Sequence, residues 1–291
     1  MARHVPREIA PGVHMLTLGR GVAASNAYLV RSGGGTWVLV DAGWRASAPA
    51  IEAAAGRLLG PDVRPTAILL THLHPDHSGA AGALARSWEV PVYAHADEVV
   101  MAAGRYLPER SMPLDRWVVV PLMNVLPARR RAAVEAAGDI TDVVRPLAAS
   151  GAVPGLPDWE YVPTPGHTPG HVAYLRRGDG VLISGDAVLT VDLSSVVGAV
   201  TGRRRLAGPP WLTTWDRAAA QRSVEALAAL NPRVLAPGHG RPLALGTARA
   251  LQALARGAAV TAPRAAGRRA GLAPGPVLRA LRRRAGSDGC C

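Results

Sequence analysis

THLHPDHSG (Thr71–Gly79) places three imidazoles and a carboxylate within six residues. It follows AILL (Ala67–Leu70), a short apolar run typical of a buried strand. An apolar core does not accommodate so many polar groups, whereas a loop at a strand end can direct them at one point. Neutral imidazole and carboxylate suit Zn²⁺, and Fe or Mn less exclusively. The stretch therefore predicts a metal site with enough ligands for two ions.

Further candidate ligands occupy the same kind of position along the chain. His167, Asp186 and His239 each follow a predicted strand and stand beside glycine, in PGH, SGD and PGHG. Glycine has no Cβ, so loops that carry these residues can crowd around one point. Asp41 ends another predicted strand, and His171 follows His167 by four residues in TPGHTPGH. The residues alone leave open which histidine of this doublet faces a metal.

Strand and helix signals alternate along the chain, which indicates an α/β layered fold. Ser47 is the expected cap of a helix that ends before Gly60, and RRGDG (Arg176–Gly180) predicts a hairpin turn. Predicted strands are 26–30, 36–40, 67–70, 90–94, 159–164, 172–175, 181–184 and 233–236, and predicted helices are 47–60, 79–88, 96–106, 128–137, 215–230 and one within 244–258.

The ordered motifs resemble the metallo-β-lactamase superfamily, whose signature is HxHxDH followed by a downstream His, an Asp and a last His. The resemblance covers residues 10–245 and implies an α/β (α+β) fold, a four-layer αββα sandwich with the metal site at one edge between the sheets. It implies two Zn²⁺ ions per chain, with Fe or Mn as alternatives. By resemblance, His72, His74 and His167 hold the first ion, Asp76, His77 and His239 hold the second, and Asp186 bridges them.

The resemblance also assigns residues that do not bind metal, and a reaction. Asp41 orients the loops, and His171 braces the loop after His167. A hydroxide that bridges the ions, held by Asp186, is the expected nucleophile, and Asp76 is counted with the catalytic groups; metal binding lowers the pKa of water from about 16 to about 7. Each ligand histidine is expected to give its other N–H to a carboxylate or a backbone carbonyl.

Asp186 narrows the substrate, because the common true metallo-β-lactamases carry Cys at this position. The resemblance then points to hydrolysis of an ester, lactone or thioester. GDAVLTVDLSS (185–195) lacks the Cys-Gly-Arg segment that follows the Asp in glyoxalase II, and the chain has no lysine, which argues against glyoxalase II proper. Two alternatives stay open: a phosphodiesterase or ribonuclease of the same fold, and a mononuclear iron persulfide dioxygenase.

Domain organisation follows from composition. Residues 1–260 form the expected hydrolase domain, in which the proline-containing stretch 104–158 is a loop-rich insertion that caps the active site. Its Met112, Leu114, Trp117 and Met123 could line a pocket, but packing is the favoured role. Residues 261–291, rich in Arg, Ala and Pro, are expected to be a flexible tail, in which Cys290 and Cys291 have no assigned role.

The net charge of +12 does not by itself predict a nucleic-acid partner. Every cationic residue is arginine, as in proteins from GC-rich genomes, and residues 264–291 carry half of the excess. The tripeptide 203–205 is either an anion contact or a solvated loop. We expect a small-molecule substrate, no nucleic acid, no membrane segment and a cytoplasmic location, because no 18-residue apolar run or secretory signal is seen. A homodimer is left open.

Overall fold

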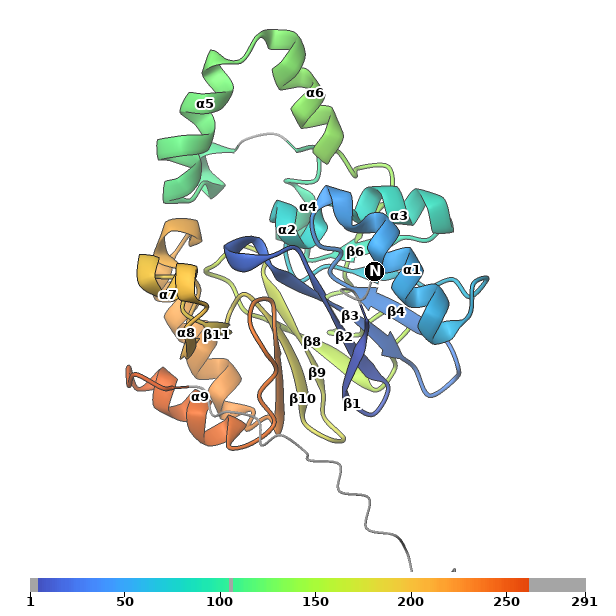
Figure 1. Ribbon diagram of the computed structural model, residues 1–291, viewed down its shortest axis with the longest axis vertical. Coiled ribbons are helices and arrows are strands. Elements are labelled where there is room, and N and C mark those ends of the chain that lie inside the picture. Colours follow the sequence, from blue (N-terminus) through green and yellow to red (C-terminus); the bar gives the residue numbers. More distant parts are fainter. Residues whose placement is uncertain (1–4, 105–106, 262–291) are drawn as a thin grey trace, which may run out of the picture.

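The computed structural model describes residues 5–104 and 107–261. Two sheets pack face to face, and helices cover both outer faces (Figure 1). The predicted four-layer αββα sandwich is therefore confirmed. The predicted tail, except for its first residue, and the two cysteines lie outside the described residues.

The larger sheet has seven strands in chain order, β1 to β7. Neighbours are antiparallel from β1 to β4 and parallel from β4 to β7, so the carboxyl ends of β4, β5 and β6 meet at one edge. The strands are β1 (Arg7–Ala10), β2 (Val13–Leu18), β3 (Ser25–Arg31), β4 (Trp37–Val40), β5 (Ile68–Leu69), β6 (Val92–Ala94) and β7 (Val144–Pro146).

The smaller sheet has the order β13-β10-β9-β8. The predicted hairpin joins β9 to β10, and β13 runs parallel to β10. Because β9 is antiparallel to both of its neighbours, β8, β10 and β13 all end at the same edge. The strands are β8 (Trp159–Pro163), β9 (Val172–Arg176), β10 (Val181–Gly185) and β13 (Val234–Pro237); β11 (Leu189–Val191) and β12 (Arg204–Ala207) form a separate ribbon.

Three apolar layers hold the sandwich together. Tyr28, Val40 and Ile183 belong to the layer between the sheets. Helices α1 (Ala48–Leu59) and α3 (Ala81–Trp88) cover the larger sheet, and α8 (Arg217–Ala229) and α9 (Thr247–Ala255) cover the smaller one (Figure 1). On α8 the predicted stripe is buried through Ala219, Val224 and Leu227, as the helical spacing requires.

The predicted helix ends agree only in part with the structure. Ser47 is the N-cap residue of α1 as predicted, but it belongs to a 3₁₀ turn, Arg45–Ser47, and its side chain makes no capping hydrogen bond. The helix predicted over 96–106 ends early, since α4 spans Ala96–Val99. Asp216 is the cap of α8, where its carboxylate accepts the N–H groups of Ala218 and Ala219.

The segment after α4 projects from the body of the sandwich, on the side where α2 (Pro75–Ser78) lies (Figure 1). It contains the 3₁₀ turn η3 (Pro108–Arg110), the π-helical turn η4 (Asp115–Val119), α5 (Val120–Val125) and the predicted helix, α6 (Ala128–Gly138). Pro127 is the residue before α6, where no backbone N–H is needed, and Pro121 is the second residue of α5, directly after the π-helical turn. Because β7 belongs to the larger sheet, the projecting segment is shorter than the predicted insertion, 104–158. No helix within the described ranges is long and apolar enough to cross a membrane.

Candidate metal centre

The topology brings all the candidate ligands to one edge of the sandwich. Asp41 follows β4, and His72 follows β5 across Leu70 and Thr71. His167, Asp186 and His239 follow the three strands of the smaller sheet that end at the same edge. Residues far apart in the chain are neighbours here because parallel strands end together.

The short helix α2 aims the rest of the HxHxDH stretch into the same space. His74 stands before the first turn, Pro75 begins it, and Asp76 and His77 follow on it. The carbonyl of His74 accepts the N–H groups of His77 and Ser78, both at 2.9 Å. The turn therefore contributes to the positions of His74 and His77 relative to each other.

Three histidines form the first group. The ligand atoms of His72, His74 and His167 lie within 4.8 Å of one another. His72 donates its Nδ1–H to Thr71 Oγ1, at 3.0 Å, because the Thr71 hydroxyl itself donates to Asp41. Its Nε2 is therefore an unprotonated acceptor that faces the group. Burial lowers the pKa of His72 and of His167 well below the ordinary value, which keeps both imidazoles neutral and ready to bind a cation.

A second group consists of Asp76, His77 and His239. The Nε2 atom of His239 lies 3.1 Å from Asp76 Oδ2, and the Nε2 atom of His77 lies 3.6 Å from the same oxygen. Asp186 stands between the two groups and, with His72 and His77, makes up a third group that could hold an ion. Its Oδ2 is 3.4 Å from His167 Nε2 and 3.3 Å from His239 Nε2, while its Oδ1 is 3.4 Å from His77 Nε2.

The carboxylates control the protonation of this second group. Burial opposes a charge on His77, but Asp186, Asp76 and Asp41 surround it and raise its pKa well above the usual range. Burial is likewise outweighed at His239, where Asp186 and Asp76 raise the pKa to about 10. Although burial alone would raise the pKa of Asp76, His77 and His239 lower it to about 2. In the second group, carboxylate oxygens therefore face imidazoles whose raised pKa favours the protonated form.

The residues fit a metal ion by two structural criteria. Buried side-chain atoms without a hydrogen-bond partner among the described residues include His72 Nε2, both ring nitrogens of His167 and Asp186 Oδ1. Such atoms are costly to bury, and a cation would satisfy them. Gly238 keeps the space clear, because a Cβ there would contact Asp186 Oδ1 and His77 Cε1.

Comparison with known proteins agrees with this geometry. The family model of the metallo-beta-lactamase superfamily matches residues 20–239. The chain belongs to this superfamily. It is 37% identical to the probable metallo-hydrolase YflN of Bacillus subtilis over 240 residues, which cover 81% of this chain and 86% of that protein.

Two further relatives broaden the comparison. A hydroxyacylglutathione hydrolase of Anaeromyxobacter dehalogenans is 32% identical over 161 residues, or 55% of this chain and 45% of that protein. A metallo-beta-lactamase family protein of Thermus thermophilus has a TM-score of 0.58 and 26% identity, covering 86% of this chain and 80% of that one. The superfamily is thus shown by sequence and by fold.

Asp41 organises the HxHxDH stretch of this superfamily member from behind. Its carboxylate accepts the Thr71 N–H at 2.8 Å, the Thr71 hydroxyl at 2.9 Å and the Nδ1–H of His77 at 2.9 Å. Its backbone has φ 58°, a left-handed conformation that Asp tolerates better than most residues. One carboxylate thus orients both His72, through Thr71, and His77.

His171 belongs to none of the three groups that could hold an ion among the described residues. Its Nδ1–H donates to Thr164 Oγ1 at 2.7 Å, and its Nε2 accepts the backbone N–H of Asp186 at 3.0 Å. Burial lowers the pKa of His171 to about 3, so the ring stays neutral, and one nitrogen can donate a hydrogen bond while the other accepts one. His171 therefore ties the loop after β8 to the residue that stands between the groups.

Histidine partners depart in part from the sequence-based expectation. His77 donates to the Asp41 carboxylate and His239 donates to the Ala24 carbonyl at 2.7 Å, as expected. His72 instead uses a hydroxyl, and neither nitrogen of His167 has a hydrogen-bond partner within the part of the chain that the structure describes. The prediction is wrong for these two, because Thr71 intervenes before the carboxylate and the loop after β8 offers His167 no acceptor.

Glu98 is a site residue that the sequence did not reveal. This fully buried carboxylate on α4 accepts the Leu73 N–H and the Gly170 N–H, both at 2.8 Å. It thereby joins the HxHxDH stretch to the TPGHTPGH loop. A glutamate in a short helix gives no pattern from which this bond could be predicted. His95, just before the same helix, accepts the Asp97 N–H and caps α4.

Proposed function

We propose that the chain is a metal-dependent hydrolase that binds two zinc ions and cleaves an ester, lactone or thioester bond. The observation that carries the proposal is the position of Asp186, whose oxygens lie 3.3–3.4 Å from imidazoles of both groups. In this proposal one ion takes the three histidines of the first group and the other takes Asp76, His77 and His239. Membership of the superfamily supports hydrolysis at a metal centre.

The substrate class rests on narrower support. One relative is named hydroxyacylglutathione hydrolase, and an acyl group on the glutathione thiol is a thioester; its similarity extends over about half of this chain. Asp186 and the absence of lysine, noted in the sequence, favour an ester, lactone or thioester other than a glutathione conjugate. We propose a small molecule as the substrate.

Two bound divalent ions would supply a nucleophilic water near neutral pH and positive charge for the substrate oxygen. The protein's own groups prepare the remaining chemistry. Asp186 and Asp76 are held deprotonated by the neighbouring histidines, which lower the pKa of both carboxyl groups, so both can accept a hydrogen bond from water. Asp76 is the more accessible of the two, with a side chain 19% exposed against 6% for Asp186. We therefore propose that Asp76 is the catalytic carboxylate that contacts the reacting water and that Asp186 positions this water.

Metal analysis and a substrate panel test the proposal together. The panel contains a thioester, a lactone, an aryl ester, a phosphodiester and a β-lactam, and the protein is analysed for zinc, iron and manganese. We expect two zinc ions per chain and hydrolysis within the first three classes. His72→Ala and Asp186→Asn should each reduce kcat/KM more than the roughly 10–100-fold that loss of a supporting partner costs.

His14→Gln is the matched control, because His14 lies on β2 opposite Glu8 and outside all three candidate groups. It should leave zinc content and hydrolysis unchanged. A single iron per chain, or full activity after either ligand substitution, would contradict the proposal. Cleavage of the phosphodiester alone would instead indicate a phosphodiesterase or ribonuclease of the same fold.

A further inference from the structure

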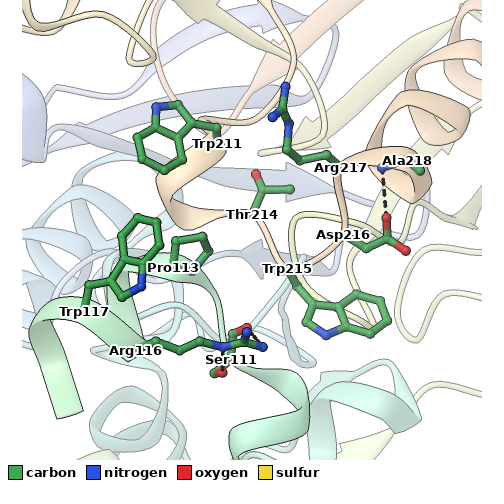
Figure 2. Close-up of a pocket in the computed structure, with 10 residues that line it drawn as sticks. All are labelled: Ser111, Pro113, Arg116, Trp117, Trp211, Thr214, Trp215, Asp216, Arg217 and Ala218. Carbon is green, nitrogen blue, oxygen red and sulfur yellow. Dashed lines mark hydrogen bonds between the residues drawn. The ribbon is translucent and has the colours of Figure 1, made fainter.

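A cavity of about 650 Å³ opens beside the candidate metal centre. Its walls come from the projecting segment around η4 and from the stretch that links η5 (Trp211–Thr213) to α8. Figure 2 shows the indoles of Trp117, Trp211 and Trp215 around it, with Arg116 and Arg217 at two of its sides. None of the candidate ligands lines this cavity, so it is a neighbouring space.

Backbone hydrogen bonds connect the cavity wall to the centre. Trp215 donates its N–H to the carbonyl of His167 at 3.1 Å, and Asp216 donates its N–H to the carbonyl of Gly166 at 2.9 Å. This wall therefore adjoins the loop that carries His167.

The aromatic groups of the cavity are unusually accessible. Trp117 is 64% exposed and Trp211 is 46% exposed, and their ring centroids lie 6.0 Å apart with the planes inclined at 58°. Trp215 is fixed by its Nε1–H, which donates to the Glu109 carbonyl at 3.0 Å. The sequence favoured packing for Trp117, but its exposure shows that it lines the cavity instead. Indoles held this way offer faces for a flat ligand.

Two arginines line the cavity, and the guanidinium of one of them has no partner among the described residues. Arg116 binds Ser111 through its Nε–H and one terminal nitrogen, which fixes the guanidinium in place. Arg217 has no hydrogen bond or ion pair from its side chain among the described residues, and that side chain borders the cavity. Within the described ranges the only lining carboxylate, that of Asp216, accepts the first N–H groups of α8. The guanidinium of Arg217 is thus available to an anion.

We propose that this cavity binds an aromatic group that carries an anionic substituent, and that this group is the part of the substrate remote from the cleaved bond. The second part of the proposal rests on the hydrolase function proposed above. The aromatic ring lies against Trp117 and Trp211, and the anion meets Arg217. The shared loop then places the rest of such a molecule toward His167.

Calorimetric titration with 2-naphthoate tests the cavity without any reaction. The uncharged 2-naphthamide is the matched ligand, and both are titrated into zinc-loaded protein and into protein stripped of metal. We expect naphthoate to bind both forms, and Trp211→Ala to weaken binding of both ligands by roughly tenfold. Arg217→Gln should weaken naphthoate by about threefold to fivefold and leave naphthamide unchanged.

Arg222→Gln is the control, because Arg222 is exposed on the same helix but does not line the cavity. Equal effects of Arg217→Gln and Arg222→Gln would overturn the proposal. So would naphthoate binding that requires zinc, since the carboxylate would then bind the ions. Self-association that Trp211→Ala abolishes, seen by sedimentation, would assign the indoles to a second copy instead. Binding to stripped protein with no hydrolysis of any panel substrate would refute the proposed function and leave the cavity standing.

Discussion

Gly238→Ala tests whether the candidate ligands are held in fixed positions. A Cβ at this residue would overlap Asp186 Oδ1 and lie 2.8 Å from His77 Cε1 and 3.0 Å from the carbonyl carbon of Gly185. The backbone cannot move away, because the Gly238 N–H donates to the Gly185 carbonyl and the Asn26 N–H donates to the Gly238 carbonyl, both at 2.8 Å. The added methyl group must therefore displace Asp186 or His77.

The expected effect is large for one methyl group. Overpacking of this kind costs roughly 1–3 kcal/mol of unfolding free energy. Asp186 stands between the two groups, so its displacement should also weaken zinc binding. We expect a loss of at least ~10-fold, since loss of a group that orients a ligand costs about 10–100-fold in metal affinity. Urea unfolding of metal-free protein measures the first quantity, and competition with a chromophoric zinc chelator measures the second.

Gly178→Ala is the matched control, since a Cβ at Gly178, in the β9–β10 turn, would meet nothing within 4 Å. It should change neither quantity. If Gly238→Ala binds zinc and unfolds as the unmodified protein does, the site is loose enough to absorb a methyl group, and the reasoning from fixed geometry fails.

Three substitutions probe the groups behind the candidate ligands. Asp41→Asn replaces the anionic acceptor of His77 with an amide, so zinc affinity should fall by roughly 10–100-fold in the chelator competition while far-UV circular dichroism stays the same. Glu98→Gln sets an NH₂ group against one of two backbone donors, and should lower the free energy of urea unfolding by about 1–3 kcal/mol. His171 has a pKa of about 3 in the fold, below the ordinary 6.5, so its neutral form adds stability above pH 6.5 that is lost as the pH falls toward 3. His171→Gln should therefore flatten this part of the urea-unfolding profile of metal-free protein, and an unchanged slope would show that His171 is not the group that titrates.

The ligand positions could be anticipated from sequence because each follows a strand. Asp41 directly follows one predicted strand, and His72 follows another after Thr71. A polar residue at the end of a buried strand lies at the edge of the sheet, and this position can be predicted from the local sequence. Pairing of β8, β10 and β13 in one direction then gathers His167, Asp186 and His239. The alternation of strands and helices predicted an α/β layered fold, whereas the four-layer order was implied by the resemblance to the superfamily.

The supports and the cavity could not be anticipated, because they depend on how loops fold back. Glu98 accepts a hydrogen bond from Gly170, which is 72 positions further along the chain, only because the chain folds back to the site. Trp117 and Trp211 lie almost a hundred residues apart and approach each other from a π-helical turn and a 3₁₀ turn, where neither the α-helical nor the strand period applies. Trp117 in an apolar stretch therefore suggested packing, although the structure leaves it exposed.

The two sheets are already joined at the site edge by the protein's own hydrogen bonds. Tyr28, on the larger sheet, donates its hydroxyl to the Pro237 carbonyl at 2.7 Å, and the Asn26 amide donates to the same carbonyl at 2.9 Å. From the smaller sheet, the Tyr174 hydroxyl donates to the Leu70 carbonyl at 2.9 Å. These buried bonds run across the same edge that the proposed ions would span, since each proposed ion would take ligands from both sheets. The ligands are thus preorganised before any ion binds, so the free energy of ion binding adds to a formed site and is not consumed in assembling it.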